Sequence, residues 1–162
     1  MKNSLLKLAK RLRTELDDLE QVVSRCERAL RQSKLTSDDL YFDSMALNVQ
    51  GFYSGLERLF HLIASTIDGK VPRGEEWHKE LLQQMRSQVS GLRPAVLSES
   101  TVKMLDEYRR IRHVVRVIYT HQLEHERLEE LTNNLRPTHT AVRRELLAFA
   151  DFLEHHAREE SK

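Results

Sequence analysis

Residues 108–121 hold the densest group of side chains in this chain that could take part in chemistry. They read Tyr-Arg-Arg-Ile-Arg-His-Val-Val-Arg-Val-Ile-Tyr-Thr-His. Successive residues of a helix are rotated by about 100°, so the aliphatic residues of this segment fall on one face. The opposite face carries, within an arc of about 120°, the basic and polar side chains Arg109, Arg112, His113, Arg116 and Tyr119.

Such a face suits a phosphate group, because arginine pairs with phosphate oxygens through two parallel hydrogen bonds and histidine can move a proton. Like charges three or four residues apart on a helix repel each other by roughly a few tenths of a kcal/mol per pair, so something must compensate them. Two explanations are open. Acids on another helix or a second subunit neutralise the cluster, for which Glu57, Asp68 and Glu76 are available, or the cluster binds a phosphate.

The composition excludes several other classes of site. With 26 Lys and Arg against 25 Asp and Glu, the net charge is +1, so any anion must be held locally rather than by a globally basic surface. The single cysteine, Cys26, excludes an internal disulfide and a cysteine-based metal site. The sequence has no zinc-protease, P-loop or dinucleotide-binding motif, and we expect neither a metal nor a cofactor.

The elements that must position the basic face are all predicted to be helices. Apolar residues recur every three or four positions from Leu5 to Leu30, which predicts a helix over about 4–33. The remaining helices are predicted at about 40–67 after N-caps at residues 36–38, at 75–89, from Ser98 to about Tyr119, and at 126–158 with a kink or break at Pro137.

These helices predict an all-α, up-and-down bundle in which a short helix is inserted between the two central long ones. The length suits a single domain over residues 1–162. No apolar run approaches the roughly 20 residues that span a bilayer, and charges interrupt the N-terminal segment too often for a signal peptide. We therefore expect a cytoplasmic protein that does not bind a membrane.

Several blocks over about residues 50–155 resemble the HepT-like branch of the HEPN superfamily. Members of this branch are small helical ribonuclease toxins paired with a minimal nucleotidyltransferase antitoxin. The blocks are residues 55–60 (Gly-Leu-Glu-Arg-Leu-Phe), 67–69 (Ile-Asp-Gly) with Pro72, 74–82, Arg93-Pro94, 105–116 and Tyr119. The resemblance implies a homodimer that cuts RNA in a basic groove between two copies, without a metal.

The active motif of that superfamily is an Arg, four to six residues and then His, often with a Tyr two residues later. By the surrounding blocks, Arg112 and Tyr119 match the family Arg and Tyr, but Val117 stands at the His position. The alternative register pairs Arg116 with His121 and has no Tyr after it. Residues five apart on one helix point about 140° from each other, so this pair requires a helix that ends near residue 120, or a site shared between subunits.

The candidate site residues follow from these two registers. Arg112 and Arg116 are the candidate phosphate ligands, and His113 or His121 is the candidate proton carrier. The resemblance makes Tyr119 a candidate for adenylylation by the antitoxin, which would place negative charge in the groove. Arg109 and His61 complete the predicted groove.

Two other functions remain open. A non-catalytic member of the same fold, which Val117 favours, would bind or neutralise a nucleotidyltransferase partner. A helical scaffold without a ligand would have no basic groove at all.

Overall fold

The apolar stripe of the N-terminal segment forms the longest contact surface of the molecule. In the computed structural model, which describes residues 1–159, helix α1 (Lys2–Thr36) packs against α2 (Leu40–Ile63) and α5 (His125–Glu159). The predicted stripe from Leu5 to Leu30 is buried throughout. Gly55 of α2 lies so close to α1 that a Cβ atom there would come within 2.9 Å of Leu19 Cδ2, so a larger residue would require the Leu19 side chain to move.

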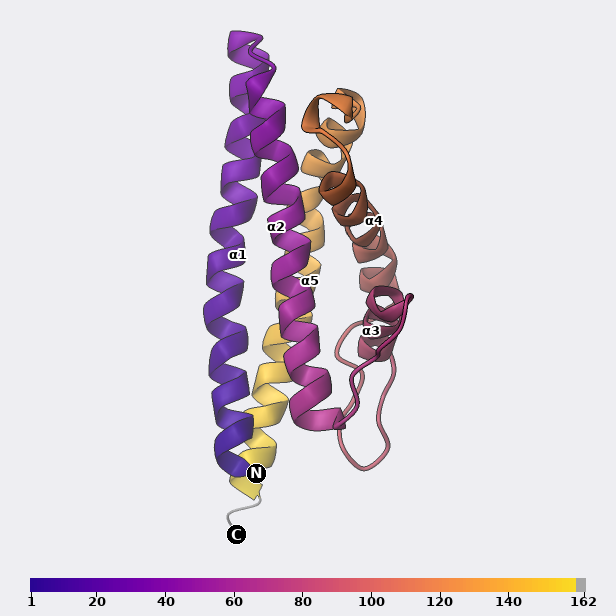
Figure 1. Cartoon of the computed structure of the whole chain (residues 1–162). Coiled ribbons are helices and arrows are strands. Elements are labelled where there is room, and N and C mark those ends of the chain that lie inside the picture. The colour runs from indigo at the N-terminus through magenta and orange to yellow at the C-terminus, as the bar shows by residue number, and fades with distance from the viewer. Residues whose placement is uncertain (160–162) are drawn as a thin grey trace.

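The four long helices run alternately up and down, with both termini at the same end (Figure 1). Helix α4 (Glu99–Val117) packs mainly on α2, and the short α3 (Trp77–Arg86) covers α2 and α4. Two further turns complete the chain, η1 (Ala64–Asp68) and η2 (Thr120–Gln122). The predicted all-α bundle of four long helices and one short helix is confirmed, and residues 1–159 contain no strand.

The predicted N-cap of α4 is confirmed, whereas the N-cap of α2 is Asp39, one residue after the predicted ones, and its side chain makes no capping hydrogen bond. The Ser98 side chain accepts a hydrogen bond from the Thr101 backbone N–H at 3.3 Å and so caps α4. Asp38 accepts the Leu40 N–H at 3.0 Å before α2. Thr36, in contrast, is the last residue of α1 and Ser37 is its left-handed C-cap, so neither caps α2.

Pro137 does not break the last helix, which excludes one of the two outcomes, a kink or a break, that the sequence predicts. Helix α5 continues across it from His125 to Glu159. Proline removes one backbone donor, but α5 is held on both sides of that position by buried Leu135, Thr138 and Val142. The free energy of packing this apolar face outweighs the local loss of one hydrogen bond.

The connection from α2 to α4 is fixed by one buried ion pair. The Arg93 guanidinium donates from Nε to Asp68 Oδ1 at 2.6 Å and from Nη2 to Asp68 Oδ2 at 2.7 Å. Asp68 closes η1, and Arg93 follows α3, so the pair holds both ends of the α3 segment against the bundle. Asp68 is thus engaged away from the basic face of α4.

Among the described residues, no helix combines the length and apolar character needed to cross a membrane.

Candidate functional site

Part of the predicted basic face is neutralised within the chain. Arg109 Nε donates to Asp106 at 2.7 Å, one turn earlier on α4, and Arg112 Nη2 lies 3.2 Å from Glu57 Oε1. Burial raises the pKa of Asp106, but the hydrogen bond from Arg109 and the nearby arginine charges outweigh burial and hold the pKa below its ordinary value. Of the two explanations left open by the sequence, neutralisation by acids therefore holds for Arg109 and Arg112, through Asp106 of the same helix and Glu57 of α2.

The last turn of α4 keeps its basic side chains free. Arg116 and His113 are exposed and make no ion pair within residues 1–159. Val117, at the position where the family motif has His, is 65% exposed and is the last residue of the helix. This end of α4 therefore presents a cation and an imidazole to solvent, but no proton carrier at Val117.

Beyond Val117 the chain leaves the helical path. Ile118 and Tyr119 have extended backbone angles, and the Gln122 side chain accepts the Tyr119 N–H at 3.0 Å. The exposed rings of Tyr119 and His121 stack with centroids 5.7 Å apart. Helix α4 was predicted to reach about Tyr119 and ends two residues earlier, so the helical separation of about 140° does not constrain Arg116 and His121.

A second cluster, which the sequence did not predict as a site, joins α2, α3 and α4. The carboxylate of Glu57 contacts His78 Nδ1 through Oε2 at 2.6 Å and Arg112 through Oε1. Arg112 also donates from Nε to Ser54 Oγ at 3.2 Å, and its Nη1 lies 3.4 Å from His78 Nδ1. We refer to Ser54, Glu57, His78 and Arg112 as the Glu57 cluster.

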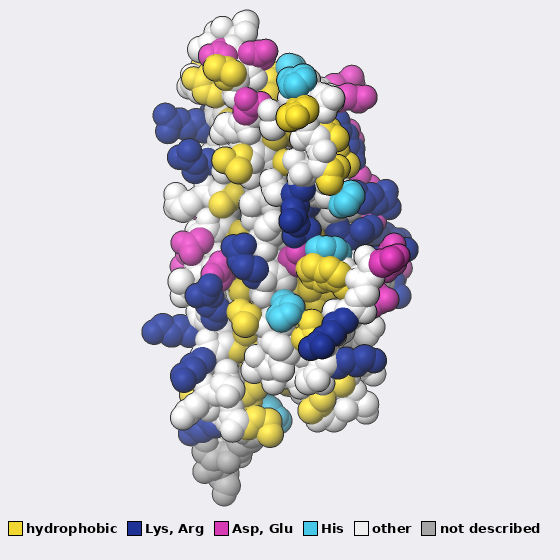
Figure 2. All heavy atoms as spheres, in the orientation of Figure 1, with side chains coloured by type: hydrophobic (Ala, Val, Ile, Leu, Met, Phe, Trp, Pro, Cys, Tyr) yellow, Lys and Arg dark blue, Asp and Glu magenta, His cyan; other side chains and the backbone are white. Residues whose placement is uncertain are grey.

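The Glu57 cluster borders a shallow depression on the surface. The depression has a volume of about 390 Å³ and is lined by Arg11, Glu57, Arg58, His61, Leu62 and Trp77. Trp77 also lies on the ring of His78, with centroids 3.4 Å apart. Figure 2 shows basic and histidine side chains around apolar ones on this face of the molecule. His61 therefore lies beside the Glu57 cluster, and Trp77, half-buried, is partly accessible.

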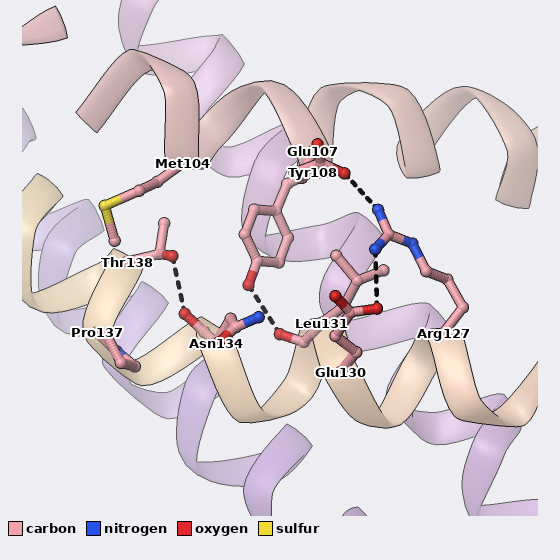
Figure 3. A pocket seen from close by; sticks show the side chains of 9 residues that line it. All are labelled: Met104, Glu107, Tyr108, Arg127, Glu130, Leu131, Asn134, Pro137 and Thr138. Carbon is pink, nitrogen blue, oxygen red and sulfur yellow. Dashed lines mark hydrogen bonds and ion pairs between the residues drawn. The ribbon is translucent and has the colours of Figure 1, made fainter. Parts of the chain in front are cut away.

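A separate groove of about 410 Å³ lies between α4 and α5 (Figure 3). Tyr108 donates its hydroxyl to the Leu131 carbonyl at 2.7 Å, and burial raises the pKa of this tyrosine. Arg127 is held between Glu107 and Glu130. Tyr108, Thr138 and the three charged side chains of Figure 3 are thus each engaged in a hydrogen bond or ion pair, and none of the sequence-predicted site residues lines this groove.

The sequence does not predict His78 as a site residue, and it predicts Glu57 only as an acid that could neutralise the basic face. The signal for Glu57 is its place on the buried side of α2, between Leu56 and Leu59, because a carboxylate is rarely buried without a partner. No signal of comparable strength marks His78, since its contact with Glu57 depends on how α3 folds back. In residues 1–159, no group of three or more His, Cys, Asp or Glu could hold a metal ion.

The fold and the basic end of α4 place this chain among small all-α proteins, a class whose members have many different functions. A family model described as HepT-like protein matches residues 44–153. The match covers well over half of the chain, which therefore belongs to the HepT-like family of the HEPN superfamily. The whole of α1 lies outside the match. No curated protein and no solved structure matches the chain.

Proposed function

We propose that this chain is the toxin-type member of a toxin–antitoxin pair and cuts RNA without a metal. The observation that carries the proposal is that α4 ends at Val117. Arg116 and His113 in its last turns and His121 in the segment after it are all exposed. Family membership supports the RNA substrate, since the resemblance implies ribonuclease activity. The antitoxin partner would be a minimal nucleotidyltransferase.

The residues have distinct roles in this proposal. Arg116, which has no acidic partner among the described residues, binds the phosphate whose bond is broken. Arg112 contributes positive charge from within the Glu57 cluster, because its own nitrogens already contact Ser54 and Glu57. A histidine then removes the proton of the ribose 2′-hydroxyl, which attacks the phosphorus atom. His113 and His121 are the two exposed imidazoles at this end of α4.

A second copy of the chain completes the proposed site. RNA is longer than the single exposed turn, and two copies facing each other would double the number of basic side chains. We propose a homodimer in which the two α4 ends form one groove, with Arg109 and His61 on its margins.

The test is RNA cleavage by purified wild-type chain and by the variants Arg112→Ala, Arg116→Ala and His121→Ala. The proposal predicts that wild type cuts total RNA and slows growth when expressed, and that Arg116→Ala loses at least tenfold in cleavage rate. A wild type that neither cuts RNA nor slows growth would refute the enzyme.

Val117 favours a second candidate function. A valine at the motif position cannot carry a proton, and its exposure shows that it does not serve the core either. In this alternative the chain binds a nucleotidyltransferase-like partner and cuts nothing. Tyr119, which is 74% exposed, would be the accessible contact.

The alternative is tested by mixing the chain with the nucleotidyltransferase and ATP. A stable complex together with intact RNA favours the binding module. A gain in mass of one adenylyl group that is absent in Tyr119→Phe assigns the modified residue, and loss of RNA cleavage upon that modification favours the toxin.

A further inference from the structure

We propose that His78 is the residue that removes the 2′-hydroxyl proton, in place of the imidazole missing at position 117. This inference rests on the proposed ribonuclease function and identifies the base of that reaction. The catalytic centre would then be the Glu57 cluster and the depression beside it, reached from the exposed end of α4.

The Glu57 carboxylate fixes the orientation of the His78 imidazole. A catalytic imidazole works best when a carboxylate fixes its tautomer and direction. The Oε2 atom of Glu57 lies 2.6 Å from His78 Nδ1, so the carboxylate accepts the Nδ1 proton, and in the neutral imidazole the free lone pair is then on Nε2. The carboxylate itself is held by Arg112 on its other oxygen. No carboxylate among the described residues makes such a contact with His113 or His121.

The other ring nitrogen of His78 is accessible to a substrate. Nε2 of His78 makes no hydrogen bond within residues 1–159 and is not among the buried atoms without a partner, so it faces solvent. The side chain as a whole is 27% exposed. The imidazole is therefore fixed on one side and open on the other, as a proton carrier must be.

Arginine side chains lie beside the His78 imidazole and around the adjoining depression. Arg112 Nη1 lies 3.4 Å from His78 Nδ1, so a phosphate drawn to Arg112 comes close to the imidazole. Arg58 and Arg11 line the adjoining depression, and Arg58 makes no ion pair within the described chain. Trp77, also in that lining, offers an aromatic face on which a base can stack. The depression thus offers the cation of Arg58, unpaired within residues 1–159, and the ring of Trp77 beside the imidazole.

The reaction balances without another reactant. His78 Nε2 takes the proton of the 2′-hydroxyl while the 2′-oxygen forms a bond to phosphorus. The bond from phosphorus to the 5′-oxygen breaks, the leaving oxygen takes up a proton from solvent water, and the protonated His78 returns its proton to the solvent. The products are a 2′,3′-cyclic phosphate and a free 5′-hydroxyl, and the proton lost by one oxygen is regained by the other.

The experiment measures cleavage of a defined RNA oligonucleotide by the full chain. The variants are His78→Asn, which keeps a donor toward Glu57 but cannot carry a proton, and His78→Ala, to which free imidazole is added. His155→Asn is the control, because His155 is an exposed histidine near the end of α5 whose ion pair, within residues 1–159, is with the exposed Glu159. Thermal unfolding monitors the fold of each variant.

The inference predicts at least a hundredfold slower cleavage by folded His78→Asn, full activity of the control, and partial rescue of His78→Ala by imidazole. The dependence of the cleavage rate on pH should also differ between wild type and folded His78→Asn. Cleavage by His78→Asn within threefold of wild type overturns the inference but leaves the proposed function intact. Absence of cleavage by wild type overturns both.

Should neither His78 variant fold, Glu57→Gln supplies the readout. The inference then predicts a changed pH profile for Glu57→Gln, because the carboxylate no longer orients the imidazole, and an unchanged profile overturns it.

Discussion

Arg112 on α4 and Glu57 on α2 form an ion pair that is largely shielded from water, with 14% and 8% of their side chains exposed. This pair lies in the middle of the surface that the sequence predicts to be an uncompensated basic face. It divides that face into a neutralised part, around Arg109 and Arg112, and a free part at Arg116. Asp106 on α4 and Glu57 on α2 therefore decide together which arginines of this face remain free.

Removal of the Glu57 charge should destabilise the protein. In Glu57→Gln the guanidinium of Arg112 stays shielded without its counter-ion, which costs about 3 kcal/mol for a buried pair. Urea unfolding measures this change in the free energy of unfolding. Glu76→Gln is the matched control, since Glu76 is exposed and forms no ion pair in the described chain, and it should change stability by less than about 0.5 kcal/mol. Equal stability of the two variants would contradict the assigned role of Glu57.

Asp68→Asn should be among the most destabilising substitutions in the chain. The side chains of Arg93 and Asp68 are 0% and 5% exposed, and the substitution leaves a buried guanidinium charge unpaired. We expect a loss of about 3–5 kcal/mol, together with faster proteolysis of the segment between α2 and α4. Asp39→Asn, at an exposed acid, is the control. A loss below about 1 kcal/mol would show that this pair is not needed to anchor the segment.

Arg116→Ala should weaken RNA binding without changing stability. The guanidinium is exposed and forms no ion pair within residues 1–159, so its removal costs the fold little. Loss of one phosphate contact should lower the slope of log K against log salt by about 0.7 for a single strand. Arg144→Ala, an exposed arginine on α5, should leave the slope unchanged. Equal slopes for wild type and Arg116→Ala would remove Arg116 from the interface.

Stability should fall as the pH is lowered below neutrality, because of His139. Burial lowers the pKa of this histidine below its ordinary value of 6.5, and Arg136 and Arg143 act in the same direction, while Glu20 opposes them. The unfolded chain therefore takes up a proton before the folded chain does, so stability is lost as the pH falls below about 6.5 toward the folded pKa. In His139→Gln the midpoint of urea unfolding should depend less on pH over this range, whereas in His155→Gln its pH dependence should be unchanged. A midpoint that is equally pH-dependent in His139→Gln would assign the effect to other groups.

The helices and the core follow from local periodicity, and so the sequence predicts them well. The stripe of α1 is buried as expected, and α2 buries its predicted residues from Met45 to Ile63. Leu40, predicted on the same stripe, is 68% exposed because it is the first residue of α2, where no neighbouring helix covers it. Differences of this kind fall at helix ends, where tertiary packing decides the boundary.

The site is less predictable, because its contacts join distant segments. Arg112 could be placed on a basic face from its own helix, but its pairing with Glu57 depends on how α4 lies on α2. The contact of His78 with Glu57 depends in turn on the fold of residues 64–76, which contain no long periodic pattern. The sequence identifies the charged residues of the site, whereas the structure determines which of them remain free.

The central proposal is that this protein cleaves RNA through attack of the RNA's own 2′-hydroxyl on the neighbouring phosphate. The most direct test is to identify the chemical groups at the ends of the product fragments. Purified full chain is incubated with a labelled RNA oligonucleotide in the presence of EDTA, and the fragments are analysed by mass spectrometry. The account predicts fragments that end in a 2′,3′-cyclic phosphate and begin with a 5′-hydroxyl. An oligonucleotide that stays intact, or fragments that carry 5′-phosphates, would contradict it.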